Sequence, residues 1–434
     1  MGPRRMTAAE AAAELRPRDT LGLGLGPANP DAFLTALGGR DDWEDLELGG
    51  ALLLGLYEVL AQPGVHYRCG FFGPVERYYR SRGARIEHVP GGFRQFAPIL
   101  ARFAPRVMAV QAAPGERPDE VNLSLHYGAT RDELLRAGRD PGRILVVEVN
   151  PNLPRTASLP PRYCNTLPLD AVDVLVEADG QPFTLEPVAP TEVDSAIAGH
   201  VLEYVEEGST LQTGIGAVPN LVATRLAESP GGGYGVHSEM FTDGLMRLHE
   251  AGKVTNTGKG ELEGVSVTTF ALGSAELYRW LDGRREVAFL PVDVVNDQDV
   301  AGGNARFLSI NGALCVDLYG QIVADNVGGR QISGVGGHED FVAAPELRLD
   351  SHSMVCMAST VTLGGEVGSR IVPVLPPGSV VSTPRHHTGV VVTEHGSADL
   401  VGLTVGERAR ALAELADPRF RDELRAAAEA MARA

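Results

Sequence analysis

Short apolar runs alternate with helical stretches along the first half of the chain. The runs Leu21–Leu25, Arg106–Gln111 and Ile144–Val149 have the length and composition of buried strands. Stretches with helical spacing separate these runs, at residues 31–37, 98–102 and 131–137. Strands that alternate with helices in this way predict an α/β fold, with a mostly parallel sheet covered on both faces.

A polar, Pro-rich stretch from Pro187 to Glu192 interrupts the pattern, which then begins again. We expect a helix over Asp194–Val205, a strand over Ser209–Thr213 and, after a glycine turn, a helix over Asn220–Ala227. Further strands are predicted at 265–269, 287–291, 307–310, 314–318, 371–374, 380–382 and 390–393, and a helical tail at 405–434 that Pro418 breaks. The sequence therefore predicts two α/β domains, residues 1–188 and 192–434.

Charge and composition restrict the class of protein. The chain has 434 residues, a net charge of −18 and only two lysines, Lys253 and Lys259. Binding to nucleic acid needs clustered cations, so we expect no nucleic-acid partner. A phosphorylated small cofactor would require only a local cluster of arginine or lysine side chains.

Cysteine usage and the N-terminal sequence bear on the compartment. Cys69, Cys164, Cys315 and Cys356 are widely spaced, without a Cys-x-x-Cys pair or the spacing of metal ligands. Two arginines near the start are not followed by an apolar segment, and the apolar runs are too short for a membrane helix. We expect a cytoplasmic protein with reduced thiols, no metal and no membrane partner.

Residues 309–341 combine the two elements that acyl transfer requires. Cys315 is a potential nucleophile within the strand-like alternation of Leu314, Val316 and Leu318. The glycine-rich turn Gly334–Gly337 follows and offers backbone N–H groups. A nucleophile together with amides that bind an oxyanion is the minimum equipment for acyl transfer.

Seven segments, in order along the chain, carry a resemblance to a known family. They are E-V-N-P-N-L-P-R-T at 148–156, Q-T-G-I-G-A-V-P-N at 212–220, H-S-E-M-F-T-D-G at 237–244, P-V-D-V-V-N-D at 291–297, G-V-G-G-H-E-D-F at 334–341, S-R-I-V-P at 369–373 and V-T-E-H-G at 392–396. Together they resemble the acetyl-CoA hydrolase/transferase family, class I CoA-transferases of the 4-hydroxybutyrate CoA-transferase branch. The resemblance implies two open α/β domains, an active-site cleft between them, coenzyme A in the form of an acyl-CoA substrate, and a homodimer.

The segment Asn311–Gln321 resembles a family motif, N-S-x-x-E-x-D-L-x-G-Q, whose glutamate is catalytic, and Cys315 occupies that position. The family reaction ends with CoA held on the glutamyl carbonyl as a thioester, and cysteine has no carbonyl to hold it. The leading hypothesis is therefore an acyl-S-Cys315 intermediate that passes its acyl group to water or to a non-carboxylate acceptor. His338 is the candidate base, and the amides of Gly336 and Gly337 are candidates for binding the oxyanion.

The resemblance also implies a binding site for coenzyme A. The loop with Gly214, Gly216 and Asn220, together with Glu239 and Gly336, is expected around the pantetheine arm and the thioester. Lys259, Arg330 and Arg370 are the candidate cations for the CoA phosphates. The loops at 22–27 and 119–128 depart from the family pattern, so the acyl specificity is expected to differ.

Alternative interpretations remain open for the same residues. Cys315 also fits an inert core position, which is the less favoured interpretation, and His338 also fits a solvated loop. Glu339 is a relocated carboxylate in a second hypothesis, which restores conventional transfer of CoA between acids, and Asp340 is a charge at a helix start. A third hypothesis is a non-catalytic, CoA-binding protein. Neighbouring His386 and His387 point opposite ways on a strand and predict no metal site.

Overall fold

The computed structural model describes residues 2–186, 188–345 and 348–433, which form two compact units. Unit 1 contains residues up to Glu186 and Val267–Val295, and unit 2 contains the segment up to Ser266 and Asn296 onward. The chain leaves unit 1 close to the predicted domain division. Residues 267–295, which the sequence prediction assigned to the second domain, return to unit 1. Pro187 and Ala434, at the ends of the predicted linker and tail, lie outside the described residues.

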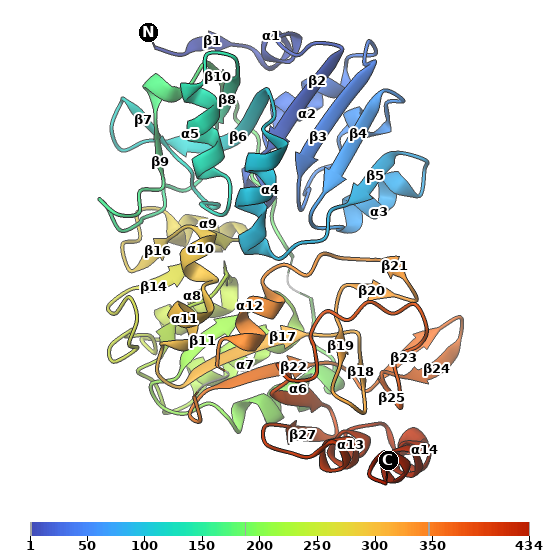
Figure 1. Cartoon of the computed structure of the whole chain (residues 1–434). Helices are drawn as coiled ribbons and strands as arrows, with labels where there is room; N and C mark the ends of the chain where they lie inside the picture. The colour runs from blue at the N-terminus through green and yellow to red at the C-terminus, as the bar shows by residue number, and fades with distance from the viewer. Residues whose placement is uncertain (1, 187, 346–347, 434) are drawn as a thin grey trace. The chain divides into compact units, whose positions relative to one another are not determined.

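Unit 1 is built on a sheet whose main path is parallel throughout, in the order β1-β10-β8-β6-β2-β3-β4-β5 (Figure 1). Two short strands, β7 and β9, add antiparallel pairs beside β6. The strands are β1 Arg4–Met6, β2 Arg18–Leu23, β3 Asp45–Gly50, β4 Val65–Cys69, β5 Arg85–His88, β6 Val107–Pro114, β7 Glu120–Asn122, β8 Ile144–Val149, β9 Thr166–Pro168 and β10 Val174–Glu177.

Helices cover both faces of this sheet, as the near-continuous apolar strands predict. Val107 and Ala109 of β6 pack into one core with α1 and α2, while Met108 and Val110 point to the other face and pack with α5. The helices of unit 1 are α1 Ala8–Ala13, α2 Asp31–Gly38, α3 Pro74–Arg80, α4 Phe96–Phe103, α5 Arg131–Arg139, α9 Ala275–Leu281 and α10 Val292–Val295.

Unit 2 has a second sheet, in the order β12-β11-β17-β22-β26-β27, which is parallel except for its last pair. These strands are β11 Thr210–Thr213, β12 Gly235–Val236, β17 Phe307–Gly312, β22 His352–Cys356, β26 Val390–Thr393 and β27 Gly396–Asp399. The helices are α6 Glu192–Leu202, α7 Ala217–Glu228, α8 Asp243–Glu250, α11 Gln298–Gly302, α12 His338–Ala343, α13 Val405–Glu414 and α14 Pro418–Met431.

Small strand pairs complete the structure, and most belong to unit 2. They are β13 Met240–Phe241, β14 Ser266–Thr268, β15 Phe270–Ala271, β16 Val287–Phe289, β18 Cys315–Asp317, β19 Ile322–Val323, β20 Asn326–Val327, β21 Arg330–Gln331, β23 Thr360–Leu363, β24 Glu366–Ser369 and β25 Ile371–Val372. β18 is the central strand of three, between β19 and β25. Leu318, Ile371 and the tail helices share one core.

Two predictions about elements need correction. The strand predicted at 380–382 is wrong, because the amide side chain of Asn326 replaces a neighbouring strand and bonds both backbone groups of Val380, at 2.8 and 3.2 Å. Pro418 does not break a continuous helix but begins α14, with Asp417 as the N-cap.

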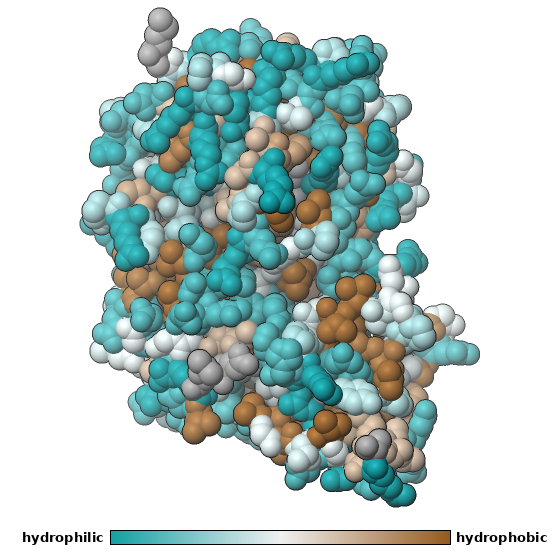
Figure 2. Space-filling model, viewed as in Figure 1, coloured by the Kyte–Doolittle hydropathy of each residue, from teal (hydrophilic) through white to brown (hydrophobic). Residues whose placement is uncertain are grey.

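The α/β prediction is confirmed, with a large, mostly parallel sheet as its main element. None of the helices in the described part of the chain is long and apolar enough to cross a membrane. Figure 2 shows apolar side chains at the surface of unit 2 near β20 and β25, where Val327, Val374 and Val380 are exposed. The homodimer implied by the resemblance stays a prediction.

Candidate active site

The candidate site of unit 2 lies where neighbouring parallel strands end. β11 is flanked by β12 and β17, and all three run in the same direction. The turn Gly214–Gly216 follows β11, and His237–Glu239 follows β12, so both segments leave the sheet at its carboxyl edge. Open α/β sheets bind their ligands at this edge.

Glu239 is held by an amide side chain and by a glycine. Nδ2 of Asn296 donates a hydrogen bond to Oε2 of Glu239 at 2.6 Å, and the backbone of Gly337 bonds to the same carboxylate. A Cβ built on Gly337 would overlap both Oε2 of Glu239 and Nδ2 of Asn296. Glycine is therefore the residue that lets the carboxylate approach this backbone.

The environment of Glu239 disfavours its charged form. Burial raises the pKa of its carboxyl to about 7, and the negative charge of Asp340 acts in the same direction. The hydrogen bonds from Asn296 and Gly337 oppose the rise. A carboxyl that titrates near neutral pH in such a site is typical of a catalytic group.

The first turn of α12 carries two predicted site residues that bond to a different segment. Nε2 of His338 lies 2.9 Å from Oγ1 of Thr383, and the same hydroxyl donates to Oε2 of Glu339 at 2.8 Å. The other oxygen of Glu339 pairs with His387. Burial lowers the pKa of His338 to about 4, so this ring is neutral at physiological pH. Glu339, the alternative nucleophile, thus has both of its oxygens engaged.

Cys315 lies at the start of β18, opposite Val323 of β19. Burial and the charge of Asp317 raise the pKa of its thiol to about 11, so the thiolate is scarce at neutral pH. Within the described part of the chain, the thiol makes no hydrogen bond, and the predicted base His338 bonds to Thr383 instead. No hydrogen bond joins the proposed nucleophile and the proposed base in the described part of the chain, so their pairing stays a prediction.

The residues predicted to bind CoA are placed in different environments. A Cβ on Gly214 would meet open space, and Gly216 has φ of 131° at the start of α7. Asn220 lies one turn into α7, beside Gly244 of α8. Gly336 has φ of 57° in the turn before α12. The turn Gly214–Gly216 is therefore accessible backbone, whereas Asn220 packs between helices and Gly337, in the second turn, is buried against Glu239.

The three cations predicted to bind the CoA phosphates differ in their exposure to solvent and in their contacts. Lys259 is 1% exposed, and its ammonium donates to the carbonyls of Val236 and Val265 at 3.1 and 2.8 Å. Burial lowers its pKa to about 7, and its contacts are those of a structural residue. Arg330 of β21 is exposed, and Arg370 is half-buried near Cys315, whose pKa its charge lowers. The two arginines remain candidates for binding phosphate.

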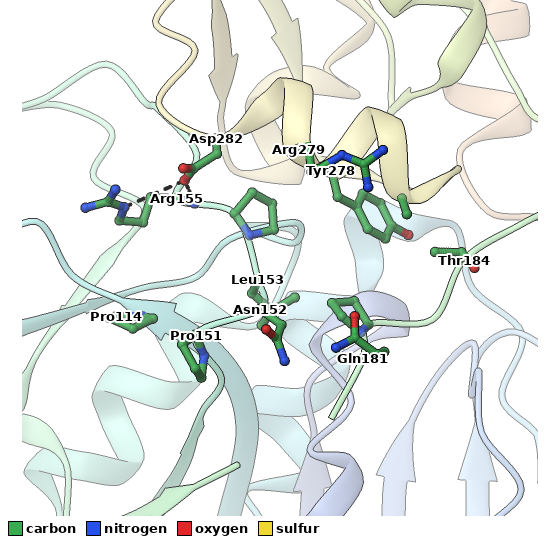
Figure 3. Close-up of a pocket in the computed structure, with 13 residues that line it drawn as sticks. Pro114, Pro151, Asn152, Leu153, Arg155, Gln181, Thr184, Tyr278, Arg279 and Asp282 are labelled. Carbon is green, nitrogen blue, oxygen red and sulfur yellow. Dashed lines mark hydrogen bonds and ion pairs between the residues drawn. The ribbon is translucent and has the colours of Figure 1, made fainter. Parts of the chain in front are cut away.

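Unit 1 has a hollow of its own, of about 770 Å³, between the loop after β8 and helix α9 (Figure 3). Figure 3 shows Arg155 and Asp282 joined on one side of it, at 3.7 Å, and Tyr278 and Arg279 entering from α9. It is lined by Pro114, Pro151, Asn152, Leu153, Pro154, Arg155, Gln181, Pro182, Thr184, Ala275, Tyr278, Arg279 and Asp282. None of the predicted site residues lines it.

Sequence reasoning missed the roles of two residues. Asn296 lies in a segment that was recognised as family-like without a function, and Asp340 was interpreted only as a helix-start charge. Asp340 does lie in the first turn of α12, yet its Oδ2 also accepts a hydrogen bond from Nδ2 of Asn296 at 3.2 Å. The P-V-D-V-V-N-D and G-G-H-E-D-F segments were the available signals, but neither indicates a contact with the other.

Comparisons with known proteins decide the family. The model of the acetyl-CoA hydrolase/transferase C-terminal domain matches residues 273–428. Butyryl-CoA:acetate CoA-transferase of Anaerostipes caccae is 33% identical over 96% of this chain and 94% of its own length. The chain belongs to the acetyl-CoA hydrolase/transferase family. This confirms the family inferred from the sequence segments, and the enzyme class: an acyl-CoA transferase or hydrolase.

Solved structures support the family's fold for this chain. RipA from Yersinia pestis has a TM-score of 0.88 at 30% identity and covers 99% of this chain and 98% of its own. A 4-hydroxybutyrate CoA-transferase from Porphyromonas gingivalis has a TM-score of 0.78 at 26% identity, with 99% and 98% covered. Among the described residues, no group of three or more His, Cys, Asp or Glu side chains is arranged to hold a metal.

Proposed function

We propose that this chain is an acyl-CoA:carboxylate CoA-transferase in which the carboxylate of Glu239 is the nucleophile. The observation that carries the proposal is the position of this carboxylate at the carboxyl edge of a parallel sheet. There it accepts a hydrogen bond from Asn296 and lies in close contact with the backbone of Gly337. Relatives whose names describe CoA transfer between short-chain acids, such as butyryl-CoA:acetate CoA-transferase, favour acids of that class as substrates.

The reaction uses the carbonyl that a cysteine lacks. The ionised Glu239 attacks the thioester carbonyl, the C–S bond breaks, and CoA leaves as the thiolate while a mixed anhydride forms. The thiolate then attacks the glutamyl carbonyl, the C–O bond breaks, and the first acid leaves as a carboxylate. Glu239 now carries CoA as a thioester, and a second carboxylate reverses both steps. Water in place of the second acid would give hydrolysis.

The groups that hold Glu239 suit the second attack. When the thiolate adds to the glutamyl carbonyl, negative charge develops on an oxygen of Glu239 itself. The N–H of Gly337 and Nδ2 of Asn296 already point to that carboxylate. Donors placed in advance at a developing oxyanion are each worth about 3 kcal/mol of transition-state stabilisation.

The acyl-S-Cys315 route is the second candidate, and its distinguishing observation is the half-buried thiol near Arg370. It would pass the acyl group to water or another non-carboxylate acceptor. The raised pKa of Cys315 and the engagement of His338 with Thr383 give this route less support than Glu239 has.

Intact-mass spectrometry after mixing with butyryl-CoA separates the two routes. We expect an adduct of CoA mass that borohydride removes, that persists in Cys315→Ser and that disappears in Glu239→Gln. Acid-to-acid exchange should fall at least ~1000-fold in Glu239→Gln, because the nucleophile is gone. An adduct of acyl mass that is lost in Cys315→Ser would overturn the proposal in favour of the thiol.

A further inference from the structure

The first three residues of α12, at positions 338–340, form hydrogen bonds with two different segments of the chain. Successive side chains on a helix point about 100° apart. His338 and Glu339 both bond to Thr383, while Asp340 turns to Asn296. Asp340 is therefore the residue of this turn that lies on the Glu239 side.

We propose that Asp340 is a positioning residue for Glu239, because it shares the amide nitrogen of Asn296 with that carboxylate and places a second negative charge beside it. The two N–H bonds of one amide group bridge the two acids, with distances of 2.6 Å to Glu239 and 3.2 Å to Asp340. This inference rests on the proposed role of Glu239 as the nucleophile.

Neighbouring residues hold Asn296 and Asp340 in their positions beside Glu239. Asn296 is 1% exposed, and the next residue, Asp297, caps α11 through its side chain. Phe341, next to Asp340, is buried, and its carbonyl accepts a hydrogen bond from Oγ of Ser309 in β17 at 2.9 Å. Asp340 is thus attached to the sheet that carries the site and cannot easily move away from Asn296.

The groups that face Glu239 come from α12, from the turn before it and from the segment before α11. Asp340 supplies negative charge, and Gly337 and Asn296 supply neutral donors. On the strand side, His237 makes an edge contact with the ring of Phe307. Glu339, in the same first turn of α12, pairs with His387 instead.

A like charge at this distance makes the Glu239 carboxylate more basic. A more basic carboxylate is a better nucleophile toward a thioester once it is ionised. It is also the poorer leaving group of the mixed anhydride, so CoA attacks more often at the glutamyl carbonyl, the C–O bond breaks, and the first acid is expelled as a carboxylate. Asp340 would therefore favour formation of the glutamyl-CoA thioester in the first half-reaction without touching the substrate.

The test is the pH dependence of kcat/KM for exchange between butyryl-CoA and acetate in Asp340→Asn. Removing the charge lowers the pKa of Glu239, so the midpoint of the acid limb should move to lower pH, by about one unit. The rate on the plateau should fall several-fold. The matched control is Glu339→Gln, which removes a charge from the same helix turn and should move the midpoint far less.

A loss of structure alone would change the amplitude of the profile and not its midpoint, and Asp340→Ala should give the same displacement as Asp340→Asn. An unchanged midpoint in both variants would overturn the inference. If the CoA adduct still forms on Glu239 in that case, the proposed function survives. If wild-type protein forms no CoA adduct on Glu239, the proposed function is wrong, and the inference about Asp340 is wrong with it.

Discussion

At the scale of single residues, the position of Glu239 depends on groups that lie far from it in the chain, Asn296 and Gly337. Glu239, Gly336 and Gly337 were all predicted near the thioester, from the resemblance of their segments. Which of them is close enough to react depends on contacts between residues far apart in the chain. The close approach of the Glu239 carboxylate to the backbone of Gly337 is such a contact, and no residue pattern within either segment predicts it.

The substitution Gly337→Ala tests this contact between Glu239 and Gly337 directly. The new methyl group would overlap Oε2 of Glu239 and Nδ2 of Asn296, so the carboxylate must move. A displacement of about 1 Å in a reacting group typically costs ~100-fold in rate, and we expect at least that loss in CoA exchange, with the fold retained. Steady-state kinetics and circular dichroism would measure the two effects.

Gly312→Ala is the control, because a Cβ on Gly312, at the end of β17, meets nothing within 4 Å. Exchange activity in this variant should stay close to that of the unmodified protein. Equal activity in Gly337→Ala and Gly312→Ala would show that the carboxylate does not need its close approach to the backbone.

At the scale of elements, most helices and strands could be predicted because apolar periodicity records which face is buried. β8 and β26 were predicted with the bounds that the structure has, Ile144–Val149 and Val390–Thr393. The strand predicted around Val380 failed because a side-chain amide satisfies its backbone. α12 was anticipated only as a helix start at Asp340, since six residues, fewer than two turns, are too few to show a helical period.

Thr383 connects α12 to the segment before β26, and its loss should destabilise that helix. Its hydroxyl is fully buried and bonds to His338 and Glu339 together. Thr383→Val leaves both partners unsatisfied, and we expect the free energy of unfolding to fall by about 1–3 kcal/mol. Amide hydrogens of α12 should exchange faster, as hydrogen-exchange mass spectrometry would report.

Thr388→Val provides the comparison. Thr388 is also buried, and its hydroxyl makes one hydrogen bond, to the carbonyl of Gly320 at 2.7 Å. Its loss should cost about 1 kcal/mol and leave exchange in α12 unchanged. If the two variants behave alike in urea unfolding and in exchange, Thr383 is not the connection that the structure indicates.

At the scale of the whole molecule, two α/β units were predicted, but the path of the chain between them was not. A break in composition marks the first crossing, near residue 187, because linkers favour Pro and polar residues. The return of residues 267–295 to unit 1 has no such mark. Its strands and helices have the same composition as those around them, and only long-range backbone pairing assigns them to a unit.

That pairing predicts that residues 1–188 do not form an independent domain. Five hydrogen bonds illustrate what the fragment would lose: Tyr127 N to Thr269 O, Ala271 N to Leu125 O, Leu185 N to Gly273 O, Gly283 N to Arg155 O and Phe289 N to Ala157 O, at 2.8–3.0 Å. The fragment would also expose the core around Phe96, into which Val292 packs. Its backbone groups would lack partners, and its sheet would lose apolar cover.

We expect residues 1–188 alone to unfold without a cooperative thermal transition. The same fragment joined to residues 267–295 by a Gly/Ser linker should regain a cooperative transition. Identical cooperative transitions in both proteins, measured by calorimetry, would mean that the shorter fragment is a domain and that the crossing segment contributes nothing to its stability.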